Sequence, residues 1–253
     1  MAGMSRDKCG AADVAGFLKV MSILKPQNLK VVGAMAMARN SVGSNAYVSD
    51  EIITSRAGVR IRVGNTDAEG RMAMVDVLAH MKEKALKETN PHLMTIATLT
   101  GHACLAVGNY TAIMDNGPAK KVNFAQSVQQ VGDEFGDPFE VSTMRKEDFE
   151  FIKDKSGEYV EVLQCNNAAS SRTPRGHQFP GAFLQKVPFR MTSAFYFIST
   201  ILILFQVSGL VDHQLKSDKP LKYSHLDVAG SSGDLPGPTT ASSVVALVMH
   251  FLN

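Results

Sequence analysis

Asn65-Thr66-Asp67-Ala68-Glu69-Gly70-Arg71 lies where the apolar pattern of this chain changes from the period of a strand to that of a helix. Five of its seven residues are polar or charged, and it separates two apolar segments. Residues 59–63, before it, alternate between apolar side chains and arginine, which predicts a β-strand. Residues 72–86, after it, repeat apolar side chains at the spacing of one helix face. The heptapeptide is therefore predicted to form a turn from a strand into a helix.

The charged residues of this turn point to a metal site. Asp67 and Glu69 stand two residues apart, so their negative charges repel each other unless a cation lies between them. Arg71 follows two residues later and would place a guanidinium beside the cation, where it could hold an anion. The simplest interpretation is a site for a hard metal ion.

Two other interpretations of the turn are open. Asp67 could cap the following helix within a solvated turn. Alternatively, residues 65–76 have the spacing of a calcium loop, with Asn65 in the first position and Asp76 in the twelfth. Such a loop normally begins with aspartate, ends with a bidentate glutamate and follows a helix rather than a strand.

The full heptapeptide resembles the signature of the leucine aminopeptidase family, the two-metal cytosolic aminopeptidases. Other segments resemble patterns of the same family, in the same order along the chain. Residues 4–12 resemble M-x-R-D-x-G-G-A-A, and residues 97–101 match A-T-L-T-G. Residues 172–183 resemble R-x-x-G-x-x-x-x-A-x-F, and residues 225–230 resemble H-x-D-I-A-G. Together the similarity covers residues 4–186 and 207–252.

The resemblance implies a metalloaminopeptidase that releases N-terminal amino acids from peptides by a two-metal hydrolytic mechanism. Two divalent ions are implied, either Mn²⁺ or Zn²⁺, with Mg²⁺ as a further option. Arg71 matches the family's catalytic arginine, which is thought to hold a bicarbonate that acts as general base. The implied metal ligands are Asp7, Asp67 and Glu69, with Glu69 expected to bridge the ions. The implied substrate-binding residues are Met4, Asn65, Thr98 and Leu99.

The sequence also departs from the family pattern. The family's remaining metal ligands, a lysine and an aspartate, come from a V-G-K-G-x-x-[FY]-D-[ST]-G-G segment upstream of the arginine–aspartate segment, and a second catalytic lysine follows them. None of these upstream residues is present in this sequence, which begins at Met1, three residues before Met4. Lys8 and Cys9 replace the usual methionine and glycine, and His102 replaces an alanine.

These departures lead to two interpretations of residues 1–253. The first is an N-terminally incomplete aminopeptidase catalytic domain with impaired activity. The second is a catalytically inactive fragment or relative that acts by assembling with full-length subunits. Because the family is hexameric, the resemblance implies a homo-oligomer in either case.

Composition narrows the cellular context. The 253 residues carry a net charge of +2 without a block of like charge, so neither a nucleic acid nor a membrane is an expected partner. The three cysteines are Cys9, Cys104 and Cys165; their number is odd and no CxxC occurs, which indicates reduced, buried thiols inside a cell. No signal peptide is evident, and a cytoplasmic location is expected.

The remaining pattern alternates strands with helices. Apolar runs predict buried strands at residues 29–38, 93–99, 110–114 and 223–229, and helices are predicted at residues 10–24, 119–135 and 240–252. This order predicts an α/β fold with three layers, α/β/α, around a mostly parallel mixed central sheet. Residues 166–180 form a loop with Arg172, Arg175 and His177, predicted either as solvated or as part of the active-site rim.

Residues 187–206 are an atypical insertion, because the family pattern has a much shorter connection there. The run at residues 195–205 is almost wholly apolar, but Arg190, Thr192 and Ser193 cut it shorter than a membrane span needs. A membrane anchor, an extra buried element and a translated intron are the three interpretations.

Overall fold

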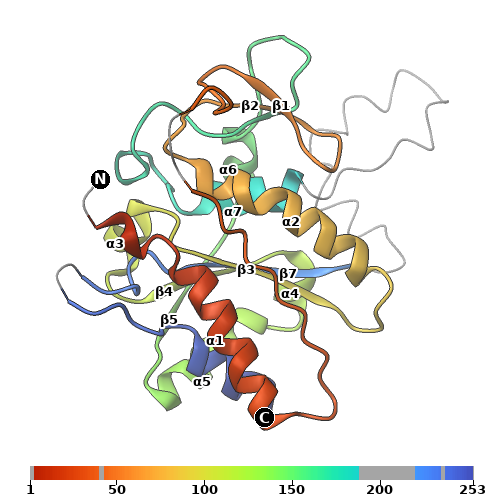
Figure 1. The fold of residues 1–253 in the computed structure, drawn as a ribbon, viewed down its shortest axis with the longest axis vertical. Coiled ribbons are helices and arrows are strands. Elements are labelled where there is room, and N and C mark those ends of the chain that lie inside the picture. The colour runs from red at the N-terminus through yellow and green to blue at the C-terminus, as the bar shows by residue number, and fades with distance from the viewer. Residues whose placement is uncertain (1–2, 40–42, 188–219, 235–236, 253) are drawn as a thin grey trace.

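The computed structural model describes residues 3–39, 43–187, 220–234 and 237–252 and shows a mixed α/β fold (Figure 1). The main sheet has the strand order β3-β7-β4-β5. Its strands are β3 (His92–Ala97), β7 (Lys222–Asp227), β4 (Thr111–Asp115) and β5 (Phe139–Ser142). β3 pairs with β7 in parallel, and β4 pairs with β5 in parallel, whereas β7 and β4 are antiparallel. The sheet is therefore mixed, with parallel pairs in the majority, as the sequence predicts.

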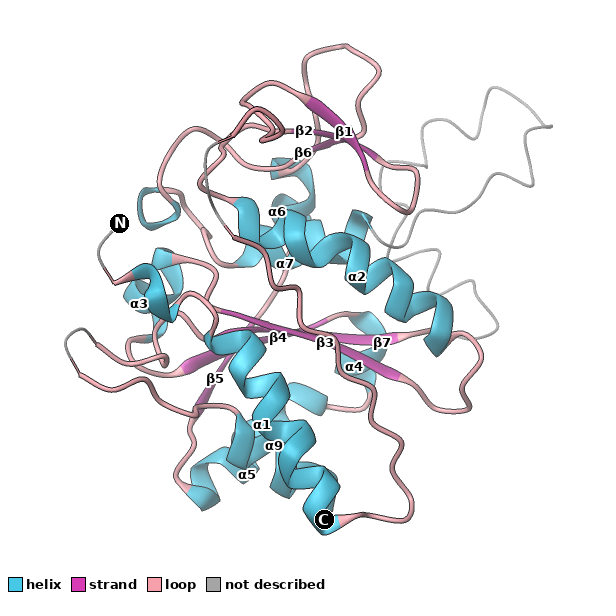
Figure 2. Cartoon of the chain, in the orientation of Figure 1, coloured by secondary structure: helices cyan, strands magenta, loops and turns pink. Residues whose placement is uncertain are grey.

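Helices cover both faces of this sheet, which gives the predicted three layers (Figures 1 and 2). One face carries α1 (Cys9–Leu24), α5 (Phe124–Phe135) and α9 (Val244–Leu252). The other carries α2 (Glu69–Ala85), α6 (Lys146–Phe151) and α7 (Gln178–Lys186). Successive side chains of a strand point to opposite faces, so Ile113 of β4 packs in the first layer and Met114 in the second.

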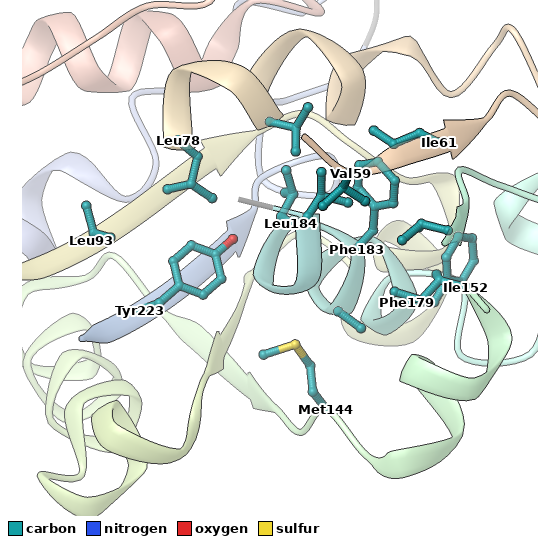
Figure 3. Close-up of a cluster of buried hydrophobic side chains, with 14 of the residues drawn as sticks. Val59, Ile61, Leu78, Leu93, Met144, Ile152, Phe179, Phe183, Leu184 and Tyr223 are labelled. Atoms are coloured by element: carbon teal, nitrogen blue, oxygen red, sulfur yellow. The ribbon is translucent and has the colours of Figure 1, made fainter. Parts of the chain in front are cut away.

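The second layer contains the core cluster drawn in Figure 3. Phe183 and Leu184 of α7 are fully buried and lie between the main sheet and a second, smaller sheet. Tyr223 contributes to the cluster from β7, and its hydroxyl is 2.7 Å from the Thr95 hydroxyl, so its polar end is satisfied inside the core. Burying such large side chains fixes α7 between the two sheets.

The smaller sheet has the order β1-β2-β6 and positions the turn at residues 65–71. Its strands are β1 (Ile52–Thr54), β2 (Arg60–Arg62) and β6 (Val162–Leu163). β1 and β2 are antiparallel, and β2 and β6 are parallel. The strand predicted at residues 59–63 is thus confirmed as β2, and Ile61 at its centre is fully buried.

Short helices complete the described chain: η1 (Met4–Arg6), α3 (Gly101–Val107), α4 (Gly117–Lys121) and η2 (Ser170–Arg172). The helix predicted at residues 119–135 is divided into α4 and α5, because Asn123 adopts a left-handed conformation with φ of 53°. The terminal helix begins at Val244 rather than at residue 240. Cys9 and Cys165 are buried as predicted, but Cys104 is exposed on α3, so that expectation is wrong for this residue.

The buried strand predicted at residues 29–38 is wrong. This segment is extended but pairs with no strand in the described ranges, and Val32, Met35 and Met37 are 54%, 52% and 66% exposed. Lys30 forms an ion pair with Glu88, which holds the start of this segment in place. An apolar run records a tendency to be buried, but a strand forms only where a second strand supplies hydrogen-bond partners.

Most of the insertion at residues 187–206 lies outside the described residues; Val187 itself is buried in the core after α7. Within the described ranges, no helix combines the length and the apolar character that crossing a membrane requires.

Gly10 tests the packing of α1 against β3. A Cβ atom at Gly10 would lie 2.1 Å from the Ile96 carbonyl oxygen, which belongs to the backbone and has little freedom to move. Gly10→Ala should therefore lower the free energy of unfolding by about 2 kcal/mol or more. Gly16→Ala is the matched control, since its Cβ would meet Val244 at an ordinary 3.5 Å, and it should stabilise α1 by about 0.5–1 kcal/mol. Urea denaturation measures both, and equal effects would contradict the packing.

Candidate functional site

A groove of about 1740 Å³ runs beside β3 and contains most of the predicted site residues. Its walls come from α1, α2, β3 and the extended residues 28–39. The predicted site residues that line it are Asp7, Asp67, Glu69, Thr98 and Leu99. Met4, Asn65 and Arg71 do not line the groove.

Gln164, which follows β6, holds the turn before α2. Its Oε1 accepts hydrogen bonds from the backbone N–H groups of Gly64 (3.1 Å) and Asn65 (3.0 Å). Its Nε2 donates to the carbonyl oxygens of Asn65 and Ala68, both at 2.8 Å. All the hydrogen-bonding capacity of this amide is therefore spent on the turn. Sequence reasoning missed Gln164, because the chain separates it from the turn by about a hundred residues.

Asn65 also has a structural role in this turn. Its Oδ1 accepts a hydrogen bond from the Asp67 N–H at 3.0 Å, which forms an Asx-type turn. Gly64 is required just before it, because a Cβ there would lie 1.8 Å from the Cys165 carbonyl oxygen. The predicted role of Asn65 in binding substrate stays a prediction.

Both alternative interpretations of the turn are wrong. The N-cap residue of α2 is Ala68, and no side chain caps the helix, so Asp67 is not a capping residue. The calcium-loop interpretation fails because Glu69 already begins α2. Asp76 lies further along this helix, where its Oδ1 accepts a hydrogen bond from the Arg56 N–H at 2.8 Å.

Asp7, Asp67 and Glu69 act on one another electrostatically in the groove. Burial raises the pKa of Asp7, and the negative charge of Asp67 raises it further, against the hydrogen bond that Thr98 donates to Asp7 at 2.8 Å. Burial likewise raises the pKa of Glu69, with added repulsion from both aspartates. A cation would relieve this repulsion.

These three carboxylates do not converge as closely as the ligands of a closed metal centre do. In the ranges that the structure describes, no three His, Cys, Asp or Glu side chains converge closely enough to hold an ion. The Oε2 atom of Glu69 is buried and has no hydrogen-bond partner there. A buried carboxylate oxygen normally has a partner, so this atom fits a bound group.

Asp227, at the end of β7, shapes the wall of the groove. This buried carboxylate accepts hydrogen bonds from the Thr100 hydroxyl (2.6 Å) and from the backbone N–H groups of Leu99 (3.2 Å) and Ala229 (3.1 Å). Burial raises its pKa to about 6 despite these bonds. Asp227 lies in one of the segments that carried the family resemblance, but no role was predicted for it.

Arg71 lies behind the turn rather than in the groove. It is 2% exposed, and its Nη1 donates to the Gln164 carbonyl oxygen at 3.0 Å. The guanidinium also lies over the Phe179 ring, 4.9 Å from the ring centre, as in a cation–π contact. Burial lowers its pKa, and its Nε has no hydrogen-bond partner within the described chain. Its predicted catalytic role stays a prediction.

Met4, the last of the predicted substrate-binding residues, lies in η1 and is 49% exposed. Arg6 of the same short helix donates hydrogen bonds to the carbonyl oxygens of Gly233 and Gly237. The N-terminal segment is thus tied to the loop that follows β7, a contact that places Asp7 at the groove.

Comparison with known proteins identifies the family of this chain. The family model described as "Cytosol aminopeptidase family, catalytic domain" matches residues 1–248. The chain belongs to this family.

Sequence relatives of this chain are named as aminopeptidases. A Caenorhabditis elegans protein named as an aminopeptidase is 49% identical over 248 residues, which are 98% of this chain and 44% of that protein. An Aquifex aeolicus protein named as a cytosol aminopeptidase is 36% identical over 138 residues, 54% of this chain and 26% of that protein. The chain therefore spans less than half the length of these relatives.

Solved structures share the fold. A mutant of tomato leucine aminopeptidase superposes with a TM-score of 0.70 at 23% identity, over 96% of this chain and 40% of that chain. The bottromycin maturation enzyme BotP superposes with a TM-score of 0.66 at 18% identity, over 95% of this chain and 45% of that chain.

In this cytosol aminopeptidase catalytic domain, the loop at residues 166–180 is tied down rather than freely solvated. His177 is buried, its Nδ1 is 2.8 Å from Nδ1 of His102, and its Nε2 is 2.8 Å from the Ser142 hydroxyl. Arg175 forms a two-pronged ion pair with Asp148, at 2.6 and 2.7 Å. His177 is therefore held by His102 and Ser142 and by none of the three groove carboxylates.

The His177 network predicts a loss of stability in acid. Burial lowers the pKa of His177 from 6.5 to about 4, and the nearby His102 and Arg175 oppose its charged form. The unfolded side chain takes up a proton near pH 6.5 that the folded one refuses until about pH 4, so stability is lost as the pH falls through this window. Lowering the pH from 6.5 to 5 should cost about 2 kcal/mol through this residue.

His177→Gln tests this expectation. Urea denaturation of the parent and the variant at both pH values gives the change in unfolding free energy. The variant should be less stable near pH 7 and should lose less on acidification, whereas an identical pH dependence would contradict the assignment to His177.

Proposed function

We propose that this chain carries the catalytic domain of a metal-dependent aminopeptidase that releases N-terminal amino acids from peptides. The observation that supports it best is the groove with three mutually repelling carboxylates, one of which has a buried oxygen without a partner among the described residues. Family membership supports the same activity. Because the relatives are more than twice as long, the activity, its peptide substrates and a cytoplasmic location are proposals for this chain.

The donor set fits hard divalent cations. Carboxylate oxygens suit Mn²⁺, Zn²⁺ and Mg²⁺, and we assign Asp7, Asp67 and Glu69 as the ligands that this chain supplies. Two such ions would lower the pKa of a bound water and polarise the peptide carbonyl. The raised pKa values of Asp7 and Glu69 support the assignment, because a cation would remove the repulsion that contributes to them.

The surrounding residues orient the ligands and the substrate. Thr98 fixes one oxygen of Asp7 through its hydrogen bond. Leu99 lies beside the first turn of α2, with its Cδ1 3.1 Å from where a Cβ of Gly70 would be, so it forms an apolar wall beside Glu69. Asp227 holds the backbone of this wall in place. A substrate side chain would therefore meet Thr98 and Leu99 next to the carboxylates.

Arg71, proposed as the catalytic arginine with a bicarbonate as general base, would have to turn toward the groove. Its Nε has no hydrogen-bond partner among the described residues and is compatible with an anion contact. A rearrangement would break the hydrogen bonds of the guanidinium to the Gln164 carbonyl oxygen and to Cys165.

A second candidate function is assembly with full-length subunits, without catalysis by this chain. The support for it is the open side of β3, which is the edge strand of the main sheet in the described ranges, beside the exposed apolar residues 29–38. Exposed strand edges and apolar segments favour contact with another chain. A hexamer is the proposed form of such an assembly.

Removing a carboxylate tests the metal assignment. Asp67→Ala and Glu69→Ala should each weaken Mn²⁺ binding by tenfold or more, on the order of 1.4 kcal/mol, because the ion loses an anionic ligand. Isothermal titration calorimetry with Mn²⁺ and Zn²⁺ measures the affinity. Asp76→Ala on the same helix removes an equal charge outside the groove and should leave the affinity unchanged; the same result for all three variants would refute the assignment.

The ligand count predicts the activity of residues 1–253 alone. Three carboxylates without the family's lysine and fourth carboxylate should hold two ions poorly, which removes terms of about 3 kcal/mol each from the transition state. Hydrolysis of leucine p-nitroanilide with Mn²⁺ should be at least about 10⁴-fold slower than in a version extended by the K-G-x-x-x-D segment. If the two versions hydrolysed the substrate at comparable rates, and Asp7→Ala abolished this activity, the extra ligands would not be needed.

A further inference from the structure

Tyr47 is one of the residues that line the groove. It lies in the segment that leads into β1, and its ring is half-buried among the residues that line the groove. Its Oη is shielded from solvent and has no hydrogen-bond partner in the described part of the chain. Leaving a buried hydroxyl unpaired is unfavourable, so such an atom normally has a partner.

Glu69 supplies the complementary unpaired atom. Its Oε2 is also buried without a partner among the described residues, and Glu69 lines the same groove. Glu69 is close enough for its charge to act on Tyr47: burial first, and then this carboxylate, raise the pKa of the Tyr47 hydroxyl. The two groups do not bond to each other, so a bound group between them would satisfy both.

The chemistry of the two atoms limits what that group is. A tyrosine hydroxyl is protonated at neutral pH, so that of Tyr47 is a hydrogen-bond donor and needs an acceptor oxygen. The Glu69 carboxylate is an acceptor only, and it needs a cation or a donor. A peptide carbonyl oxygen next to a cation on Glu69 meets both requirements, because it has two lone pairs and carries no charge of its own.

We propose that the Tyr47 hydroxyl donates a hydrogen bond to the carbonyl oxygen of the first peptide bond of the substrate. This inference rests on the proposed aminopeptidase function and adds a substrate-contacting residue to it. As water attacks the carbonyl carbon, the C=O π-electron pair moves onto this oxygen, so the hydrogen bond strengthens in the transition state. Tyr47 is then a catalytic residue that stabilises the developing negative charge.

Tyr47→Phe removes only the hydroxyl, and Tyr159→Phe is the matched control. Tyr159 is 75% exposed and lies under the guanidinium of Arg60, away from the groove-lining set. Calorimetry in Mn²⁺ would measure the affinity for leucinamide, which carries the same carbonyl group but is a poor substrate. The Tyr47 variant should bind leucinamide about tenfold more weakly, with Mn²⁺ affinity within twofold of the parent. The control should match the parent in both.

Two further readouts separate a substrate contact from a structural role. The thermal midpoint of Tyr47→Phe should equal or exceed that of the parent, because the change deletes an unpaired buried hydroxyl rather than a hydrogen bond of the fold. Leucinamide should alter the tyrosine ultraviolet difference spectrum of the parent, and this change should be absent in Tyr47→Phe. In an extended version with measurable hydrolysis of leucine p-nitroanilide, kcat should fall about 10²-fold.

The outcomes distinguish this inference from the proposed function. Equal leucinamide affinity in parent and Tyr47→Phe, or no leucinamide binding by the parent, overturns the role of Tyr47. Loss of Mn²⁺ affinity in Tyr47→Phe also overturns it, since the hydroxyl would then serve the metal. If Asp67→Ala and Glu69→Ala leave Mn²⁺ binding unchanged while Tyr47→Phe still loses leucinamide, the metal assignment fails and the Tyr47 contact stands.

Discussion

The side-chain amide of Gln164 is the interaction on which the site depends. Its two acceptor positions and two donor hydrogens are all used by the backbone of Gly64, Asn65 and Ala68. Those backbone groups lie in a turn, where no regular strand or helix could satisfy them. By pairing them, Gln164 lets β2 end and α2 begin within a few residues, and this sets the position of Glu69 at the start of α2.

The hydrogen bonds of Gln164 form one clamp on the site, and hydrogen bonds made from the main sheet form a second. Asp227, at the end of β7, binds the backbone of Leu99 and the side chain of Thr100, and Thr98 in turn binds Asp7. Both clamps connect segments about a hundred residues apart in the chain. The carboxylates therefore line one groove because two buried polar side chains hold two loops, whereas the apolar cluster around Phe183 fixes the sheets that carry those loops (Figure 3).

Most polar groups named here in the core are paired, but Nε2 of His225 and Nε of Arg71 are buried without a hydrogen-bond partner among the described residues. In the core, Tyr223 and Thr95 pair with each other, and Asp227 is fully engaged. In the groove, Tyr47 and Glu69 each keep a buried polar atom without a partner in the described chain, beside the exposed apolar residues 29–38. What distinguishes the groove is that such atoms occur there together with the carboxylates of Asp7, Asp67 and Glu69, and this combination supports the proposals.

The sequence by itself determined the local elements, the α/β class and the family, because apolar periodicity is a local property and the heptapeptide from Asn65 to Arg71 is a specific string. The sequence also predicted that Asp7, Asp67 and Glu69 act together as metal ligands. It could not decide that residues 29–38 stay unpaired, that Arg71 turns into the core over Phe179, or that Gln164 and Tyr47 belong to the site. Those outcomes depend on which distant strand supplies a hydrogen-bond partner and on which way a buried side chain points, and only tertiary packing decides either one.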